Sequence, residues 1–274
     1  MKILATDLDG TLFYPKDKKE MICKDNLTFI RDFIDQGNKL VIVTGRSLAY
    51  CKQVARRINR NVTLVCYNGA IINEDDVDIY DFSIPNDVAK EIINQGFEST
   101  KIKGAFIMTE NGVFVRTRSN NILFRRISEI FYESQKVYAE KFNIDPKSYE
   151  YELNFGKIHK IMFFFGIMPK SKSNAREYNK ILREEYEFME SSWSNNAIEI
   201  TNRQCSKGNA ILKYICIKGI SKEDVYVVGD SGNDISMFKE FKENSFCMSH
   251  AHRVVKKYSN NIIDKFVDLK KWLF

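Results

Sequence analysis

The chain opens with KILATDLDGTL (residues 2–12), in which a short apolar run meets two aspartates and a glycine. Ile3-Leu4-Ala5 predicts a buried strand, because consecutive apolar residues before a turn suit the interior of a sheet. Asp7 and Asp9 follow two residues apart on a backbone that is leaving the strand, so both carboxylates can reach one cavity. Gly10 lets the chain turn away from them. We therefore expect a site at the end of the first strand.

Apolar strands and helical patterns alternate on either side of a different middle segment. Four further strands are predicted at residues 40–43, 62–66, 225–228 and 246–248. Helical patterns precede or follow each of them, as at residues 47–58 and 207–218. Strands this apolar are typical of a parallel sheet that helices cover on both faces. We expect an α/β fold with a doubly wound, parallel sheet.

The middle segment has another rhythm. Asn111-Gly112 lies between two β-like runs and predicts a hairpin with a type I′ turn. The other elements predicted before the first rhythm returns are strands at residues 158–165 and 197–201 and a helix near residues 175–185. We interpret residues 1–83 and 192–274 as one discontinuous core domain, and residues 84–191 as a smaller inserted α+β domain.

Composition excludes several classes of protein. The chain has 274 residues, 44% of them hydrophobic and 28% charged, and a formal net charge of +6. The basic surplus is spread along the chain rather than gathered in a stripe, so we expect no nucleic-acid partner. No apolar run approaches the length of a membrane span or a signal peptide, and the six cysteines contain no Cys-x-x-Cys pair. We expect a cytoplasmic protein with reduced thiols and no membrane partner, either a monomer or a weak homo-oligomer.

Four short motifs resemble those of one family. Asp7-Leu8-Asp9-Gly10-Thr11 resembles the first motif of the haloacid dehalogenase (HAD) superfamily, Asp-x-Asp-Gly-Thr. Three further resemblances follow in order, to the second motif at Thr44, the third at Lys207, and the fourth at Gly229–Asp234. The size and position of the insertion resemble the Cof-type branch, whose α/β cap lies between the second and third motifs. The resemblance implies a HAD core carrying such a cap.

The resemblance also implies roles for individual residues. Asp7 would attack phosphorus and form an aspartyl-phosphate, while Asp9 would act as general acid and then general base. Mg²⁺ would be held by Asp7, the backbone carbonyl of Asp9, and Asp230. The expected phosphate- or substrate-binding residues are Thr44, Gly45, Lys207 and Asn233. Asp234 would orient Lys207 or a metal-bound water.

Three residues have weaker assignments. Arg46 and Asn68 lie at predicted strand ends and are possible substrate contacts. His250 stands in Met248-Ser249-His250-Ala251, where the family often has Met-Gly-Asn-Ala, so it would lie near the site rim. We interpret His250 as a residue that starts a helix, with altered substrate contacts as the alternative.

The expected function is hydrolysis of small phosphomonoesters, such as sugar phosphates or phosphorylated cofactors, with Mg²⁺ as cofactor. One alternative is a phosphomutase of the phosphomannomutase type, because those enzymes share a similar cap and first motif. A second alternative is a phosphate-dependent regulatory binding protein with a retained site. The presence of Asp7, Asp9, Lys207 and Asp230 together favours the enzyme.

Overall fold

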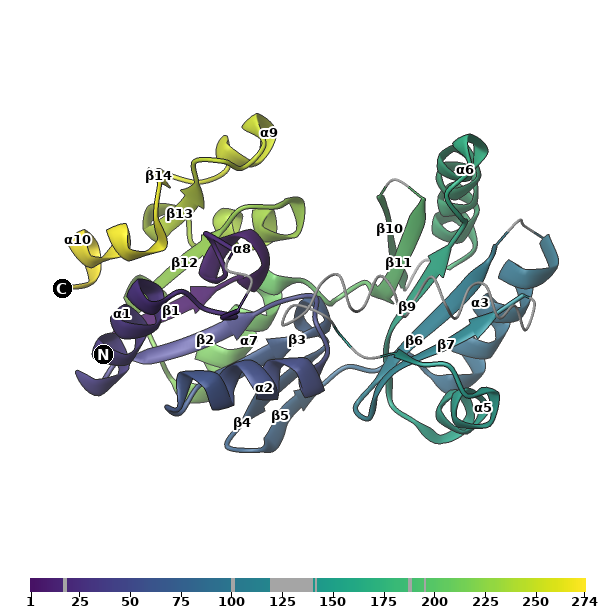
Figure 1. Ribbon diagram of the computed structural model, residues 1–274, viewed down its shortest axis with the longest axis horizontal. Helices are drawn as coiled ribbons and strands as arrows, with labels where there is room; N and C mark the ends of the chain where they lie inside the picture. The colour runs from purple at the N-terminus through teal and green to yellow at the C-terminus, as the bar shows by residue number, and fades with distance from the viewer. Residues whose placement is uncertain (17–18, 100–101, 119–139, 141, 187–188, 195) are drawn as a thin grey trace. The chain divides into compact units, whose positions relative to one another are not determined.

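The computed structural model describes residues 1–16, 19–99, 102–118, 140, 142–186, 189–194 and 196–274. The chain folds as two compact units (Figure 1). The first unit contains Met1–Asp81 and Ser206–Phe274, and the second contains Phe82–Cys205. The predicted second boundary, between residues 191 and 192, therefore lies too early in the chain.

An eight-stranded sheet forms the centre of the first unit. In spatial order its strands are β14 (Asn261–Ile263), β13 (Ser245–Met248), β12 (Val225–Gly229), β1 (Ile3–Thr6), β2 (Lys39–Val43), β3 (Thr63–Cys66), β4 (Ile71–Glu74) and β5 (Val77–Asp81). Neighbouring strands from β14 to β3 pair in parallel, and β4 and β5 pair antiparallel. The predicted parallel α/β fold is confirmed.

Helices cover both faces of this sheet. They are α1 (Lys24–Asp35), α2 (Leu48–Ile58), α7 (Lys207–Lys218), α8 (Ile235–Glu240), α9 (Arg253–Lys256) and α10 (Lys270–Leu273). Apolar residues of α7 and α8 form one core with alternate residues of β1 and β2, such as Ile3 and Val41. Helix α2 lies in front of the sheet in Figure 1, and α7 lies behind it. The alternation arises because successive strand residues point to opposite faces.

The hairpin of β4 and β5 was not predicted from the sequence. Its turn is made by Asp75 and Asp76, both of which adopt positive φ angles of 54° and 61°. Aspartate tolerates this left-handed conformation better than most residues, but without glycine the pair gives a weak hairpin signal. The exposed residues of β5 add no clear apolar alternation.

The second unit has its own six-stranded sheet. In order its strands are β10 (Met189–Ser194), β11 (Ala197–Asn202), β9 (Ile158–Phe164), β6 (Gly104–Thr109), β7 (Gly112–Thr117) and β8 (Phe142–Asn143), all antiparallel except β7 with β8. The helices α3 (Asn86–Ser99), α5 (Pro146–Phe155) and α6 (Pro169–Glu185) supply much of its apolar core. Because β11 pairs with β9 in this sheet, residues 192–205 belong to the inserted unit rather than to the core.

The hairpin of β6 and β7 is confirmed, but its predicted turn is wrong. Thr109 pairs with Gly112, so Glu110 and Asn111 make the turn. Neither has a positive φ angle, which a type I′ turn requires at both positions. Asn111 instead donates its backbone N–H to the Thr109 hydroxyl and its side-chain amide to Glu152.

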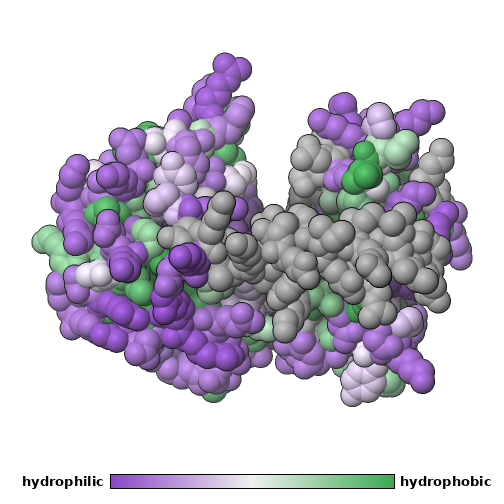
Figure 2. Space-filling model, viewed as in Figure 1, coloured by the Kyte–Doolittle hydropathy of each residue, from purple (hydrophilic) through white to green (hydrophobic). Residues whose placement is uncertain are grey.

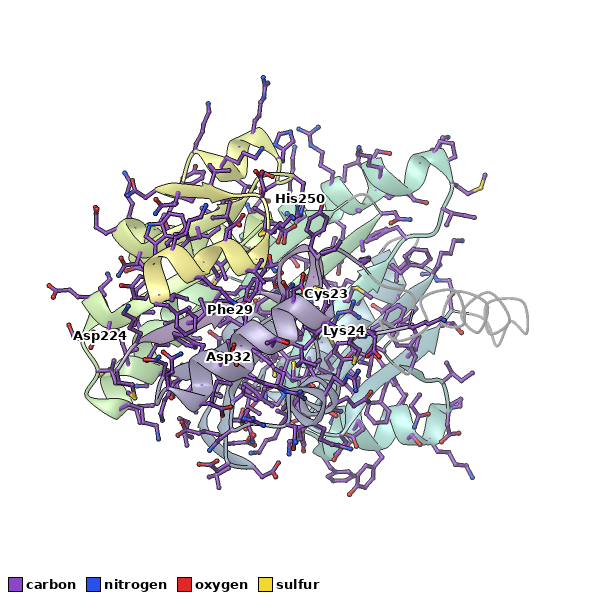
Figure 3. All side chains as sticks on the ribbon, turned by 60° about the vertical axis from the view of Figure 1, so that its left-hand side comes forward. Cys23, Lys24, Phe29, Asp32, Asp224 and His250 are labelled. Carbon is purple, nitrogen blue, oxygen red and sulfur yellow. The ribbon has the colours of Figure 1, made fainter. Side chains whose placement is uncertain are left out.

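The carboxyl ends of β12, β1, β2 and β3 lie next to one another in the first unit. Figure 3 labels a residue at each end of these strands: Asp224 precedes β12 at its amino end, and His250 follows β13 at its carboxyl end. Apolar side chains occupy only small separate areas of the visible surface in Figure 2. Among the described residues, no helix has both the length and the apolarity needed to cross a bilayer. In parallel sheets ligands bind beyond the carboxyl ends of the strands, so a site is expected at the ends of β12, β1, β2 and β3.

Candidate active site

Asp7 is placed by the central strand β1. Its backbone N–H continues the parallel ladder by donating to Val228 at 3.0 Å, and only 5% of the residue is exposed. The chain then turns at Gly10, whose φ is 86°. A Cβ atom at Gly10 would lie 2.5 Å from Oδ2 of Asp230. Glycine is therefore needed here both for the turn and for the close approach of the two loops.

Lys207 brings a positive charge into this position. Helix α7 begins at Lys207, after Ser206 accepts a capping hydrogen bond from the backbone N–H of Asn209. The Lys207 side chain is fully buried, and its Nζ donates to Oδ1 of Asp7 and to Oδ1 of Asp234, each at 2.6 Å. One ammonium group thus joins two carboxylates that are more than 200 residues apart in sequence.

Asp230 and Asp234 complete the group at the end of β12. Asp234 is fully buried, and its Oδ2 accepts backbone N–H groups of Asp230 and Ser231, both at 2.9 Å. Asp230 accepts a hydrogen bond from the Thr11 hydroxyl at 2.9 Å. Asp7, Asp230 and Asp234 each offer a carboxylate oxygen, and these oxygens lie within 4.8 Å of one another. We call these three residues the acidic cluster.

Burial dominates the electrostatics of the acidic cluster. Burial raises the pKa of Asp7 above its usual value, against the lowering effect of the Lys207 ammonium. Burial also raises the pKa of Asp230, against the Thr11 hydrogen bond. Burial alone would lower the pKa of Lys207. The negative charges of Asp234 and Asp7 outweigh this effect and raise the pKa above its usual value, so the ammonium stays charged. Three carboxylates with one ammonium lack positive charge, and a divalent cation would supply it.

The donors around this position suit a hard cation. Asp7 and Asp230 provide carboxylate oxygens, whereas Asp234 already accepts four hydrogen bonds from Lys207, Ser231 and the Asp230 backbone. Oxygen ligands without cysteine or histidine fit Mg²⁺ rather than Zn²⁺. Asp7 and Asp230 are therefore the available carboxylate ligands, and Asp234 is better placed to orient Lys207.

The carboxylate of Asp9 is not part of the acidic cluster. Its two carboxylate oxygens both accept from Arg46: Nε donates to Oδ2 at 2.8 Å, and Nη2 donates to Oδ1 at 2.9 Å. Arg46 follows β2, the strand next to β1. The sequence placed Arg46 as a possible substrate contact, but its guanidinium group binds Asp9 in this structure.

The remaining predicted phosphate-binding residues lie on the loops after β2, β3 and β12. Thr44 is buried, and its backbone carbonyl accepts from the N–H of Asn68 at 2.9 Å. A Cβ atom at Gly45 would lie 3.0 Å from the Asn68 amide oxygen. That oxygen accepts from the Asn233 side chain at 3.1 Å. The loops after β3 and β12 are thus joined by the side chains of Asn68 and Asn233, and Thr44 and Gly45 lie beside them.

His250 lies in the turn after β13, and its Nε2 is 3.9 Å from Oδ2 of Asp230. Its ring packs against that of Tyr14 at an angle of 34°, with 4.1 Å between the ring centroids. The interpretation of His250 as the residue that starts a helix is wrong. Helix α9 begins at Arg253, and His252 caps it by accepting from the backbone N–H of Val254.

The structure adds residues to which the sequence assigned no role. Thr11 was noted only as part of a motif, yet its hydroxyl holds Asp230. Ser231 donates to the amide oxygen of Asn233 at 2.6 Å. Tyr14 and Tyr50 lie beside His250 and Arg46. The motif spacing could have indicated Thr11, but the contacts of the two tyrosines depend on the folded loops.

A family model described as haloacid dehalogenase-like hydrolase matches residues 4–268. The chain belongs to this family. Its predicted membership is confirmed, and the chain is a hydrolase whose curated relatives include proteins named as phosphatases.

Three comparisons place this hydrolase among known proteins. It is 24% identical over 261 residues to the 5-amino-6-(5-phospho-D-ribitylamino)uracil phosphatase YwtE of Bacillus subtilis, covering 87% of this chain and 85% of that protein. A haloacid dehalogenase-like hydrolase from B. subtilis has the same fold, with a TM-score of 0.78, 20% identity and full coverage of both chains. A HAD subclass IIB sugar phosphatase is similar, with a TM-score of 0.75, 21% identity and full coverage of both chains. These structures agree with a Cof-type HAD fold.

Proposed function

We propose that this hydrolase is a Mg²⁺-dependent phosphatase that acts on small phosphomonoesters through an aspartyl-phosphate on Asp7. One observation carries the proposal. The buried ammonium group of Lys207 holds Asp7 and Asp234 together beside Asp230, at the carboxyl edge of a parallel sheet. A buried carboxylate that is short of positive charge suits a reaction whose substrate and metal bring the missing charges.

Asp7 is the proposed nucleophile. One of its carboxylate oxygens attacks phosphorus, a new O–P bond forms, and the bond from phosphorus to the ester oxygen breaks. Asp9 gives its proton to that ester oxygen as the alcohol leaves. Asp9 then takes a proton from water, whose oxygen attacks phosphorus and releases phosphate and free Asp7. Lys207 holds the reacting carboxylate in place throughout.

Asp7, Asp230 and the backbone carbonyl of Asp9 are the proposed ligands of Mg²⁺. When bound, the cation would favour ionised Asp7 and offset the negative charge of the phosphoryl oxygens. Asp234 would keep Lys207 in position, as its hydrogen bond supports. Thr44, Gly45, Lys207 and Asn233 are the proposed groups around the phosphoryl oxygens. Lys207 contacts Asp7 directly, and the other three lie on the loops after β2 and β12.

The proposed substrates are sugar phosphates or phosphorylated cofactors. YwtE is named for a phosphorylated ribityl compound, and the structural neighbour of subclass IIB is named a sugar phosphatase. Both names describe a phosphate ester on a small polyhydroxylated carbon chain. We propose a cytoplasmic location for this hydrolase, where such metabolites occur.

A phosphate-release screen tests this proposal. The purified protein is assayed with Mg²⁺ against a panel of sugar phosphates and phosphorylated cofactors, with Asp7→Asn as the control. Release of phosphate by the parent, and none by the variant, is expected. An isomerised sugar phosphate without free phosphate would indicate a mutase instead. Binding of a phosphate ester without any turnover would indicate a regulatory protein.

A further inference from the structure

Asp9 and Arg46 form a two-pronged ion pair beside the proposed nucleophile. Both oxygens of Asp9 are engaged, by Nε and Nη2 of Arg46 at 2.8 and 2.9 Å. Two parallel hydrogen bonds between a planar guanidinium and a carboxylate fix the plane of the carboxylate as well as its position. The side chain of Asp9 is 38% exposed, so burial alone does not fix its position.

Arg46 is itself held from three directions. Its backbone N–H donates to the Thr44 hydroxyl at 3.2 Å, and its carbonyl accepts from the Tyr67 N–H at 3.1 Å. Its guanidinium carbon lies 4.9 Å from the ring centroid of Tyr50. The Tyr50 ring is buried on α2, so it gives the cation a rigid surface to pack against. Arg46 therefore links helix α2 to the half-buried carboxylate of Asp9.

The position of Asp9 matters because its carboxylate oxygens are not part of the acidic cluster. A carboxyl group that protonates the leaving oxygen must approach from the side of the ester, not from the side of the metal ligands. We propose that Arg46, supported by Tyr50, is a positioning residue that directs Asp9 toward the leaving-group oxygen. The inference rests on the proposed function, in which Asp9 is the general acid. For this step one of the two hydrogen bonds opens, the freed oxygen of Asp9 carries the proton to the ester oxygen, and Arg46 keeps its hydrogen bond to the other oxygen.

Leaving groups of different acidity test this role. An alkyl phosphate such as glycerol phosphate needs its leaving oxygen protonated, whereas 2,4-dinitrophenyl phosphate releases a stable phenolate. For Arg46→Met we expect kcat/KM to fall by about 100-fold on the alkyl ester and by less than about fivefold on the aryl ester. Asp9→Asn should show the same split. The double variant should lose little more than Asp9→Asn alone, because both changes remove one function.

Matched variants separate positioning from a general effect of charge or folding. Arg60 makes the same two-pronged pair with Asp35 at an exposed place in the same unit, at 2.6 and 2.8 Å. Arg60→Met should leave both esters at the parental rate. Tyr50→Leu should repeat the Arg46→Met split more weakly, whereas Tyr50→Phe keeps the aromatic ring and should behave like the parent. Inhibition by inorganic phosphate should be unchanged in Arg46→Met.

The outcomes that would overturn the inference are distinct. Equal losses of Arg46→Met on the alkyl and aryl esters, or weaker inhibition by phosphate, would assign Arg46 to the phosphoryl group instead. A folded Arg46→Met with parental activity on both esters would remove it from the reaction. A parent protein that releases phosphate from no ester, neither these two nor those of the screen, would overturn the proposed function and this inference together. Circular dichroism confirms that each variant is folded.

Discussion

The first unit holds two clusters in which buried carboxylates bind lysine, at opposite ends of the strands of one sheet, and the clusters differ in charge balance. At the carboxyl edge, the acidic cluster has three carboxylates and one ammonium, Lys207. At the other edge lies a group that we call the Glu74 cluster. It consists of Glu74 and its four partners Lys39, Thr63, Tyr214 and Lys218.

The pKa values of the two carboxylates move in opposite directions. Burial alone would raise the pKa of Glu74, but hydrogen bonds from Lys218, Tyr214 and Lys39 outweigh it and lower the pKa to about 2. Burial raises the pKa of Asp7, and a single lysine shared with Asp234 does not reverse this. The Glu74 cluster is complete by itself and needs no ligand. The acidic cluster is short of positive charge, which is the condition expected of a site that binds a cation and reacts.

The largest expected effect is the loss of turnover in Asp7→Asn. A carboxamide cannot form the acyl phosphate, so activity should fall by at least about 1,000-fold while the fold is kept. Glu74→Gln, the matching change in the Glu74 cluster, should keep parental activity. The measurement is phosphate release with the best substrate of the screen. Activity of Asp7→Asn within about tenfold of the parent would remove Asp7 from the reaction.

Removal of metal should affect the acidic cluster alone. We expect chelation with EDTA to abolish turnover and added Mg²⁺ to restore it, because Asp7 and Asp230 offer hard oxygen ligands. Mg²⁺ should also raise the melting temperature of the parent by binding the folded state. Mg²⁺ should raise the melting temperature of Glu74→Gln by the same amount as that of the parent, and the melting temperature of Asp230→Asn much less. Full activity after exhaustive chelation would contradict the charge argument.

Removing a lysine from each cluster compares their contributions to stability. Lys207→Met leaves two buried carboxylates without their ammonium, so the free energy of unfolding should fall by about 3–5 kcal/mol at neutral pH. Lys39→Met leaves Glu74 with Lys218 and Tyr214, and we expect a loss of about 1 kcal/mol. Urea unfolding at low ionic strength measures both. Equal losses would show that the two clusters depend on their lysines in the same way.

A smaller effect than that of Lys207→Met concerns stability in acid. The pKa of Glu74 is lowered from 4.5 to about 2 on folding, so its contribution is complete above pH 4.5 and is lost as the pH falls toward 2. Glu74→Gln should therefore lower the free energy of unfolding by about 1–2 kcal/mol at pH 7. The difference from the parent should shrink below pH 4.5. A difference that grows on acidification would have the wrong sign for this account.

The two clusters also differ in how far the sequence predicts them. Asp7, Asp230 and Lys207 follow strand ends or begin a helix, where topology alone brings distant residues to one edge. Glu74 gave no such signal, because it ends an antiparallel strand whose Asp75-Asp76 turn lacks glycine. The pairing of Arg46 with Asp9 was also missed. It depends on the reach of one side chain between two neighbouring loops, which a sequence pattern does not encode.

The second boundary of the inserted unit shows the same limit of prediction from the sequence. The sequence indicated an inserted α+β segment from its change of rhythm, but it placed residues 192–205 with the core. Strand β11 joins the second sheet through its pairing with β9, in which Ile200 lies opposite Ile161. Such non-local pairing leaves no local signal, because a strand with one buried face would have the same alternation in either sheet.

The most direct test of the account is chemical trapping of the phosphorylated residue. The protein and a substrate are mixed with Mg²⁺, quenched in acid during turnover and treated with borohydride, which reduces an acyl phosphate to an alcohol. Trypsin then releases the peptide of residues 3–16, which contains both Asp7 and Asp9. We predict that mass spectrometry finds homoserine at position 7 and unchanged aspartate at position 9. Reduction at Asp9, or no reduced residue in a sample that is turning over, would contradict the assignment of Asp7 as the nucleophile.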